Sequence, residues 1–165
     1  MLNKHAMTLM ERANYERYVN RLSERIAEIP WTWFISLNSH STDINTVHTH
    51  LTNYITSIGG VIGHRYRYCL AICEHESVHT SSGVTPLHVH GFIQCPDHIT
   101  GESLRNAWLD RRSVSSYVPT SEKRNTLIGR TEVERFDPTK KGIRYTVDQS
   151  IGVILTNVAA IKSIL

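Results

Sequence analysis

The sequence predicts an α+β domain in which helices pack on a central antiparallel β-sheet. Its 165 residues are enough for about one domain with a sizeable buried core. Segments with helical and with strand-like hydrophobic periodicity alternate along the chain. In the middle, two strand-like runs, 65–76 and 86–96, are joined by a connection rich in Ser, Gly and Thr. That arrangement is typical of an antiparallel hairpin with a long turn.

The composition is that of a globular protein and says little about its partner. Hydrophobic residues make up 40% of the chain, and the formal net charge is +3. This mild basic excess is compatible with a nucleic-acid partner. Three cysteines without metal-binding spacing indicate a reducing compartment, and we find neither a secretory signal nor a membrane-spanning run. We therefore expect a cytoplasmic protein that has no membrane partner.

The first half of the chain predicts an amphipathic helix, a strand, a second helix and a long strand. Hydrophobic spacing separates helices from strands, whereas Pro30 and the pair Gly59-Gly60 stop the two helices. The first helix forms an N-terminal segment, 1–30, ahead of a single domain over 31–165. The expected elements are a helix over 7–28, a strand over 31–38, a helix from Thr42 or Asp43 to about Ile58, and a strand over 65–76.

The second half predicts two more strands and three more helices. Asp137 as N-cap and Pro138 at the first helical position form a strong helix start. The apolar tail is too short and too interrupted by polar residues to cross a bilayer, so we expect a final helix that packs on the domain. The expected elements are a strand over 86–96, a helix from Glu102 to about Arg111, a loop over 112–126, a strand over 128–136, and helices over 137–149 and 151–165.

Two histidines lie two residues apart on the strand over 86–96. Side chains two apart on a strand point to the same face, so His88 and His90 project side by side. Two adjacent imidazoles suit one divalent metal ion. The other His-x-His pair, His48 and His50, falls on the second predicted helix. There the two side chains are about 200° apart around the axis and cannot share an ion.

Acidic and phenolic side chains complete a candidate site. Pairing of the two central strands would bring Glu74 near the histidines, and Glu76 has the same strand parity. Two imidazoles and one carboxylate form a three-ligand site for Mn²⁺ or Mg²⁺ that leaves positions open for phosphate oxygens. Downstream, one helix face carries a tyrosine among polar groups, which is more typical of a surface than of a core. This face comprises Lys141, Tyr145, Asp148 and Gln149.

The order of these features resembles the HUH endonucleases, a family of rolling-circle replication initiators, relaxases and single-strand transposases. The resemblance covers roughly residues 31–150. The run 133–138 is similar to the segment that precedes the third family motif in plasmid and phage initiators. The segments that carry the resemblance are Trp33–Asn38 for the first motif, Leu87–Ile93 for the His-hydrophobe-His motif, and Arg144–Asp148 for the third motif, Tyr-x-x-Lys.

The resemblance implies a ferredoxin-like or RRM-like fold with the activity of a metal-dependent DNA nickase. Such an enzyme cuts single-stranded DNA by forming a 5′-phosphotyrosine and can rejoin the strand without ATP. By this resemblance, His88 and His90 would hold Mn²⁺ or Mg²⁺, with Glu74 as the third ligand. Tyr145 would be the nucleophile.

Two features of the third motif leave alternatives open. Asp148 stands where the family has lysine, and Lys141, one turn earlier, could take over its role. The spacing from Tyr145 to Gln149 resembles that of single-strand transposases, in which Gln149 would replace Glu74 as the third ligand. A transposase or relaxase, and a catalytically degenerate nucleic-acid-binding module, are therefore the alternatives to a replication initiator.

The expected partner is single-stranded DNA, at the replication origin of a plasmid or virus or in a hairpin. Basic and aromatic side chains are its candidate contacts, namely Arg65, Tyr66, Arg67 and Arg105. The sequence contains no Gly-x-x-x-x-Gly-Lys phosphate loop, so any helicase that the reaction needs would come from the host, together with a polymerase, or from a part of the protein outside this sequence. A homodimer is compatible with the sequence, and for a viral protein the location would be the host cytoplasm.

Overall fold

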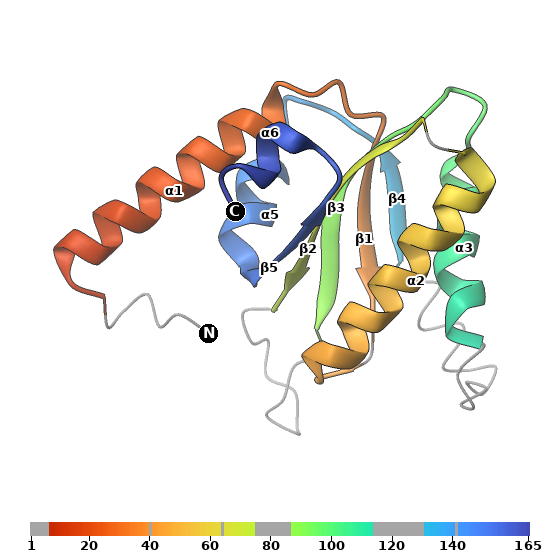
Figure 1. Cartoon of the computed structure of the whole chain (residues 1–165), viewed down its shortest axis with the longest axis horizontal. Coiled ribbons are helices and arrows are strands. Elements are labelled where there is room, and N and C mark those ends of the chain that lie inside the picture. Colours follow the sequence, from red (N-terminus) through yellow and green to blue (C-terminus); the bar gives the residue numbers. More distant parts are fainter. Residues whose placement is uncertain (1–6, 40, 64, 75–86, 114–130, 141) are drawn as a thin grey trace.

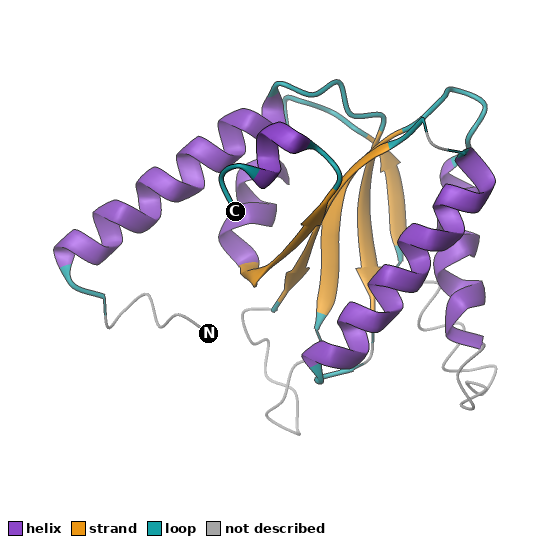
Figure 2. Cartoon of the chain, in the orientation of Figure 1, coloured by secondary structure: helices purple, strands orange, loops and turns teal. Residues whose placement is uncertain are grey.

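The computed structural model describes residues 7–39, 41–63, 65–74, 87–113, 131–140 and 142–165. Within this part of the chain, helices lie on both sides of a single sheet (Figures 1 and 2). No helix in it is long and apolar enough to cross a membrane. The elements are α1 (Leu9–Ala27), β1 (Trp33–Asn38), α2 (Ile44–Ile62), β2 (Arg67–Cys73), β3 (His88–Gln94), α3 (Gly101–Ser113), β4 (Glu132–Arg135), α5 (Gly142–Gln149), β5 (Ser150–Thr156) and α6 (Ala159–Lys162).

The sheet has five strands in the order β4-β1-β3-β2-β5, and each of its four pairings is antiparallel. This confirms the α+β class with an antiparallel sheet. The expected central hairpin is also confirmed, because β2 pairs with β3 from Arg67 opposite Gln94 to Cys73 opposite His88. The strand that carries the two histidines is therefore the middle strand, with a neighbour on each side.

Each face of the sheet is covered by helices and has its own core. On one face α2 and α3 pack over a cluster that contains Val89 and Ile93 of β3. On the other face α1, α5 and α6 pack over a cluster that contains Phe92. This division follows from the two-residue period of a strand, which sends alternate side chains to opposite faces. The histidine face thus lies beneath α1 and α5.

Helix α1 is amphipathic, as expected, and only its second half is buried. Thr8 and Glu11 form a capping box at its start. Its buried residues are Val19, Leu22 and Ile26, whereas Leu9 near the start is 87% exposed. The first half of the helix projects past the sheet in Figure 1. The N-terminal segment therefore shares a hydrophobic core with α5 and α6.

The expected end of the second helix at Ile58 is wrong. Helix α2 continues through Gly59 and Gly60 to Ile62, and Gly63, with φ 73°, caps it. A glycine inside a helix costs only about 1 kcal/mol relative to alanine, so it does not stop a helix that is well packed. At Gly59 there is a packing reason for glycine, since a Cβ would lie 3.2 Å from the Tyr66 hydroxyl.

The expected final helix over 151–165 is wrong for its first part. Residues Ser150–Thr156 form strand β5, which pairs with the outer edge of β2, and only Ala159–Lys162 is helical. Short apolar runs fit a buried helix and a strand equally well. The free edge of β2 decides between them, because pairing satisfies its backbone hydrogen-bonding groups.

The helix expected to start at Pro138, after the Asp137 cap, begins four residues later. The Asp137 carboxylate accepts hydrogen bonds from the amide and the hydroxyl of Thr139, and α5 starts at Gly142. Aspartate favours such turns as well as helix caps, because its side chain bonds to a backbone amide two residues on. Strand β4 covers Glu132–Arg135, and the remainder of the expected strand before residue 131 lies outside the described residues.

The cap of α2 predicts a pH dependence of stability. Asp43 accepts hydrogen bonds from the hydroxyl and amide of Thr46 and from the amide of Asn45, and these bonds hold the pKa of its carboxyl below 3.8. Because the folded pKa lies below the unfolded one, this stabilisation is present above pH 3.8 and is lost as the pH falls through the folded value.

We expect Asp43→Asn to keep a capping oxygen but to lose less stability than the wild type on acidification. Urea unfolding, followed by circular dichroism at neutral pH and at about pH 3, measures how much free energy of unfolding each protein loses between the two pH values. Equal losses in the two proteins would contradict the assigned cap.

Candidate active site

Two histidine side chains lie side by side on the central strand. His88 and His90 are 4% and 8% exposed, and their Nε2 atoms are 3.0 Å apart. The two rings are nearly perpendicular, at 82°, with centroids 4.5 Å apart. The expectation that they project from one face of β3 is confirmed. Their burial was not expected, and it results from α1 and α5 packing on that face.

The spacing of the pair fits adjacent ligands of one metal ion. Two nitrogens about 2.1 Å from an ion and at right angles to each other lie about 3.0 Å apart. The observed distance between the Nε2 atoms is 3.0 Å. The same distance suits a hydrogen bond between the rings, in which one Nε2–H donates to the other nitrogen.

Two aromatic rings flank His90. Phe34 on β1 lies parallel to its imidazole, with centroids 5.7 Å apart at 16°. Tyr145 on α5 contacts it edge-on, with centroids 5.4 Å apart at 64°. Tyr145 is 44% exposed, so its ring lies between the buried histidines and solvent. The structure thus brings the tyrosine of the third motif to the histidines of the second, although 55 residues separate them in sequence.

The strand register places Cys73, not Glu74, beside the histidines. Cys73 is opposite His88 in the β2–β3 pairing and shares its face. Glu74 follows the last residue of β2, and its amide donates a 3.4 Å hydrogen bond to the carbonyl of Gln149. Among the described residues, no three His, Cys, Asp or Glu side chains lie close enough together to hold an ion. A role for Glu74 as ligand stays a prediction, and Glu76 lies outside the described residues.

Helix α5 presents different residues to the site and to α1. Tyr145 and Gln149 are one turn apart, so they share the side that faces the histidines and the end of β2. Asp148 accepts from the hydroxyl of Tyr15 on α1, at 3.1 Å to its carboxylate and 3.2 Å to its carbonyl. Arg144 bonds to Glu16 of α1 at 2.6 Å.

These contacts assign Asp148 to the α1–α5 contact. Lys141, its expected substitute, lies outside the described residues.

Cys73 ties the site to α5 and is not a thiolate. Burial raises the pKa of its thiol to about 12, opposed by a hydrogen bond from the His90 backbone. Its Sγ lies 3.6 Å from the carbonyl of Ala71 and 3.8 Å from that of Thr146 on α5, and its one proton can be donated to either. The thiol therefore stays protonated at neutral pH. Sequence reasoning did not single out Cys73, Phe34 or Tyr15, and the signal that could have found the first two is their strand parity with His88 and His90.

A small pocket of about 90 Å³ adjoins the aromatic side of the site. Phe34 forms one wall, and Gly142 at the start of α5 lies against the same ring. Across the pocket, Lys140 pairs with Glu134 of β4 at 3.4 Å. The pocket thus begins where the ring that stacks on His90 meets the start of the helix that carries Tyr145.

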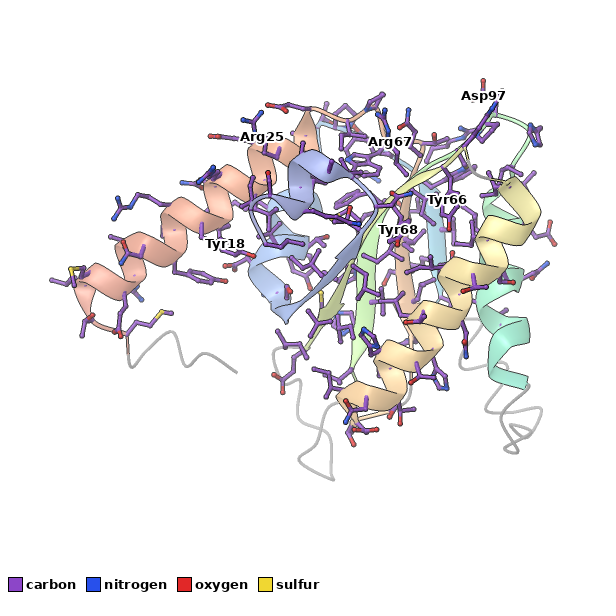
Figure 3. All side chains as sticks on the ribbon, in the orientation of Figure 1. Tyr18, Arg25, Tyr66, Arg67, Tyr68 and Asp97 are labelled. Carbon is purple, nitrogen blue, oxygen red and sulfur yellow. The ribbon has the colours of Figure 1, made fainter. Side chains whose placement is uncertain are left out.

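Three of the four expected DNA contacts gather at the other end of the sheet. Arg65, Tyr66 and Arg67 line one groove of about 480 Å³. Arg105 lies on α3 and does not line this groove. Figure 3 shows Tyr66 and Arg67 near the start of β2.

Comparison of the chain with protein-family models, with curated proteins and with solved structures finds no match. The chemistry of the site is therefore argued from its own residues.

Proposed function

We propose that the protein is a metal-dependent endonuclease that nicks and rejoins single-stranded DNA through a 5′-phosphotyrosine, as HUH replication initiators do. The observation that carries the proposal is the 3.0 Å convergence of His88 and His90 Nε2, with the Tyr145 ring against His90. The topology supports it. The order β1-α2-β2-β3-α3-β4, with these strands arranged β4-β1-β3-β2, is compatible with a ferredoxin-like fold to which β5 adds an edge strand.

In the proposed reaction Tyr145 acts as the nucleophile. Its phenolic oxygen forms a bond to phosphorus while the bond from phosphorus to the 3′ oxygen breaks, and that oxygen takes up a proton. Attack by the same 3′ hydroxyl reverses the step, so joining needs no ATP. Because Tyr145 is partly exposed, a DNA strand can reach its hydroxyl. Because His88 and His90 are buried, bulk water is kept from their imidazoles beside the scissile phosphate.

The histidine pair is the candidate holder of the metal ion. Bound there, Mn²⁺ or Mg²⁺ would polarise the scissile phosphate and stabilise the charge that develops on it. Gln149 and Glu74 are the candidates for the third ligand, and their backbones meet in one hydrogen bond at the end of α5. Separate Gln149→Ala and Glu74→Ala variants distinguish them, because Mn²⁺ binding should weaken only in the variant that lacks the true third ligand.

A denaturation-resistant protein–DNA adduct tests the proposal. The probe is a single-stranded DNA pool with a randomised central segment, incubated with the protein and Mn²⁺. A label at the 3′ end is expected to stay with the protein through denaturing electrophoresis, whereas a label at the 5′ end is released. Binding of the pool without any adduct, under all divalent ions tried, would instead indicate the nucleic-acid-binding module.

One observation favours a second candidate with the same chemistry. The i, i+4 spacing of Tyr145 and Gln149 on α5 suits the ligand set of single-strand transposases. Transfer of a strand between hairpin ends, rather than nicking and rejoining at one site, would identify that activity.

Metal binding itself is a separate prediction. We expect wild-type protein to bind one Mn²⁺, measured by loss of the free-ion electron paramagnetic resonance signal. The double variant His88→Asn/His90→Asn should bind at least about tenfold more weakly, since changes even outside the ligand shell cost that much. The matched control is His48→Asn on α2, an exposed histidine of the other His-x-His pair. Undiminished binding by the double variant would place the ion elsewhere.

A further inference from the structure

The groove at the start of β2 combines features that the proposed active site does not use. It holds about 480 Å³ and is lined by Arg65, Tyr66, Arg67, Gln94, Cys95 and Pro96. Arg67 and Gln94 are register partners at one end of the β2–β3 pair, whereas Cys73 and His88 are partners at the other end. The groove and the histidines thus occupy opposite ends of the same two strands.

The groove offers two positive charges that pair with no acidic side chain among the described residues. Arg65 and Arg67 are both exposed, and neither forms an ion pair with any described residue. A third cation lies nearby, since the guanidinium of Arg135 is 4.3 Å from the centre of the Trp33 ring and acts electrostatically on Cys95. Asp97, which also acts on Cys95, is an acidic side chain at this rim. The balance of these charges favours a ligand with several negative charges.

The groove also has a rigid aromatic wall. The Tyr66 hydroxyl donates a 2.9 Å hydrogen bond to the carbonyl of Ile55 on α2, and its ring stacks on Tyr68 with centroids 5.7 Å apart. The side-chain amide of Asn157 donates to the Tyr66 carbonyl at 2.8 Å, which holds the Tyr66 backbone in place as well. An aromatic ring fixed in this way can accept a stacked base without losing further side-chain freedom.

We propose that this groove is a second subsite for the DNA strand, in which Arg65 and Arg67 hold backbone phosphates and Tyr66 supports an unpaired base. Charge along the backbone together with an aromatic platform is the combination that single-strand binding uses. A duplex, whose bases are stacked on each other, cannot use the platform. The inference rests on the proposed function, because it takes the substrate of the histidine–tyrosine site as the ligand.

The strand geometry sets the minimum length of DNA that engages both sites. Six residue steps of β3 separate His88 from Gln94, which is about 20 Å at 3.3 Å per residue. Tyr66 packs on the α2 side of the sheet, opposite the histidine face, so the DNA must also turn round the end of the sheet. A stacked strand rises about 3.4 Å per nucleotide, so at least about six nucleotides are needed to span the two sites. Shorter strands reach only one of them.

Binding of a labelled oligothymidylate in EDTA, followed by fluorescence anisotropy, tests the subsite without any nicking. We expect Arg65→Gln/Arg67→Gln to bind about tenfold more weakly and to lower the slope of log affinity against log salt by about 1.4, which is 0.7 for each lost phosphate contact. The control Arg12→Gln/Arg21→Gln removes the same charge from exposed positions of α1 and should bind as the wild type does. Equal losses in the two double variants would overturn the proposal.

An abasic strand of the same length and charge tests the aromatic wall without a change to the protein. Wild-type protein is expected to prefer the base-containing strand at least about fivefold for each stacked base. No preference, or equal competition by duplex DNA or by polyglutamate, would overturn the assignment to single-stranded DNA.

The adduct assay separates this proposal from the proposed function. On strands longer than the span, the groove variant should form adduct more slowly than the wild type, whereas on strands shorter than the span the two rates should agree. Absence of adduct in every protein, with the binding difference in EDTA intact, would refute the nickase and leave the subsite standing. Normal adduct formation together with unchanged binding by the groove variant would refute the subsite and leave the nickase standing.

Discussion

Tyr145→Phe is expected to abolish the covalent protein–DNA adduct while leaving the fold and Mn²⁺ binding intact. The substitution removes only the phenolic oxygen, so the ring can keep its edge-on contact with His90. Because that oxygen is the proposed nucleophile, the rate of adduct formation should fall at least about a thousandfold. Time courses on denaturing gels with a 3′-labelled strand measure the rate.

The matched control for this substitution is Tyr18→Phe. Tyr18 on α1 is 38% exposed, close to the 44% of Tyr145, and the side chain that acts on its hydroxyl is Cys69 rather than a histidine. It should form adduct at the wild-type rate. An adduct that persists in Tyr145→Phe and disappears in Tyr15→Phe would assign the nucleophile to α1 instead. Tyr15 is the relevant alternative because its hydroxyl contacts Asp148 of the same helix α5.

Gly91→Ala is expected to give the largest loss of stability among single substitutions near the site. A Cβ at this position of β3 would overlap the carbonyl oxygen of Cys69 and would lie 2.8 Å from the Cα of Leu70. Both are backbone atoms of the adjacent strand β2, which cannot move without breaking the ladder. We expect the free energy of unfolding to fall by about 3 kcal/mol or more, at the upper end of overpacking effects.

Gly60→Ala is the control for the glycine substitution. Gly60 lies inside α2, and a Cβ there would meet no atom within 4 Å. Alanine is the better helix former, so this variant should gain up to about 1 kcal/mol. Urea unfolding monitored by circular dichroism measures both changes. A Gly91→Ala protein as stable as the wild type would show that the β2–β3 spacing is looser than described.

Gly91→Ala also couples stability to the proposed chemistry. Gly91 directly follows His90 and pairs with β2, the strand that also positions Cys73 opposite His88. Any widening of the β2–β3 pair therefore displaces both imidazoles relative to Tyr145. We expect Mn²⁺ affinity and adduct formation to decline together in folded Gly91→Ala protein.

The sequence by itself determined the local features of the site. The alternation around His88 and His90 was enough to place both imidazoles on one strand face, since a strand has a strict two-residue period. The helical period likewise placed His48 and His50 on α2 and ruled them out as a pair. The cap of α2 was narrowed to Thr42 or Asp43, and the structure has Asp43, because capping depends on residues only two or three positions away.

Only the tertiary structure decided which surfaces meet. The tail at Ser150–Thr156 is a strand because β2 has an unpaired edge for it, and no local pattern carries that information. The histidine face is buried because α1 and α5 cover it, and Asp148 turns to Tyr15 because α1 lies alongside. The register put Cys73 rather than Glu74 opposite His88. The physical reason is that periodicity records which face of an element is apolar, whereas the partner of that face depends on contacts between residues far apart in the chain.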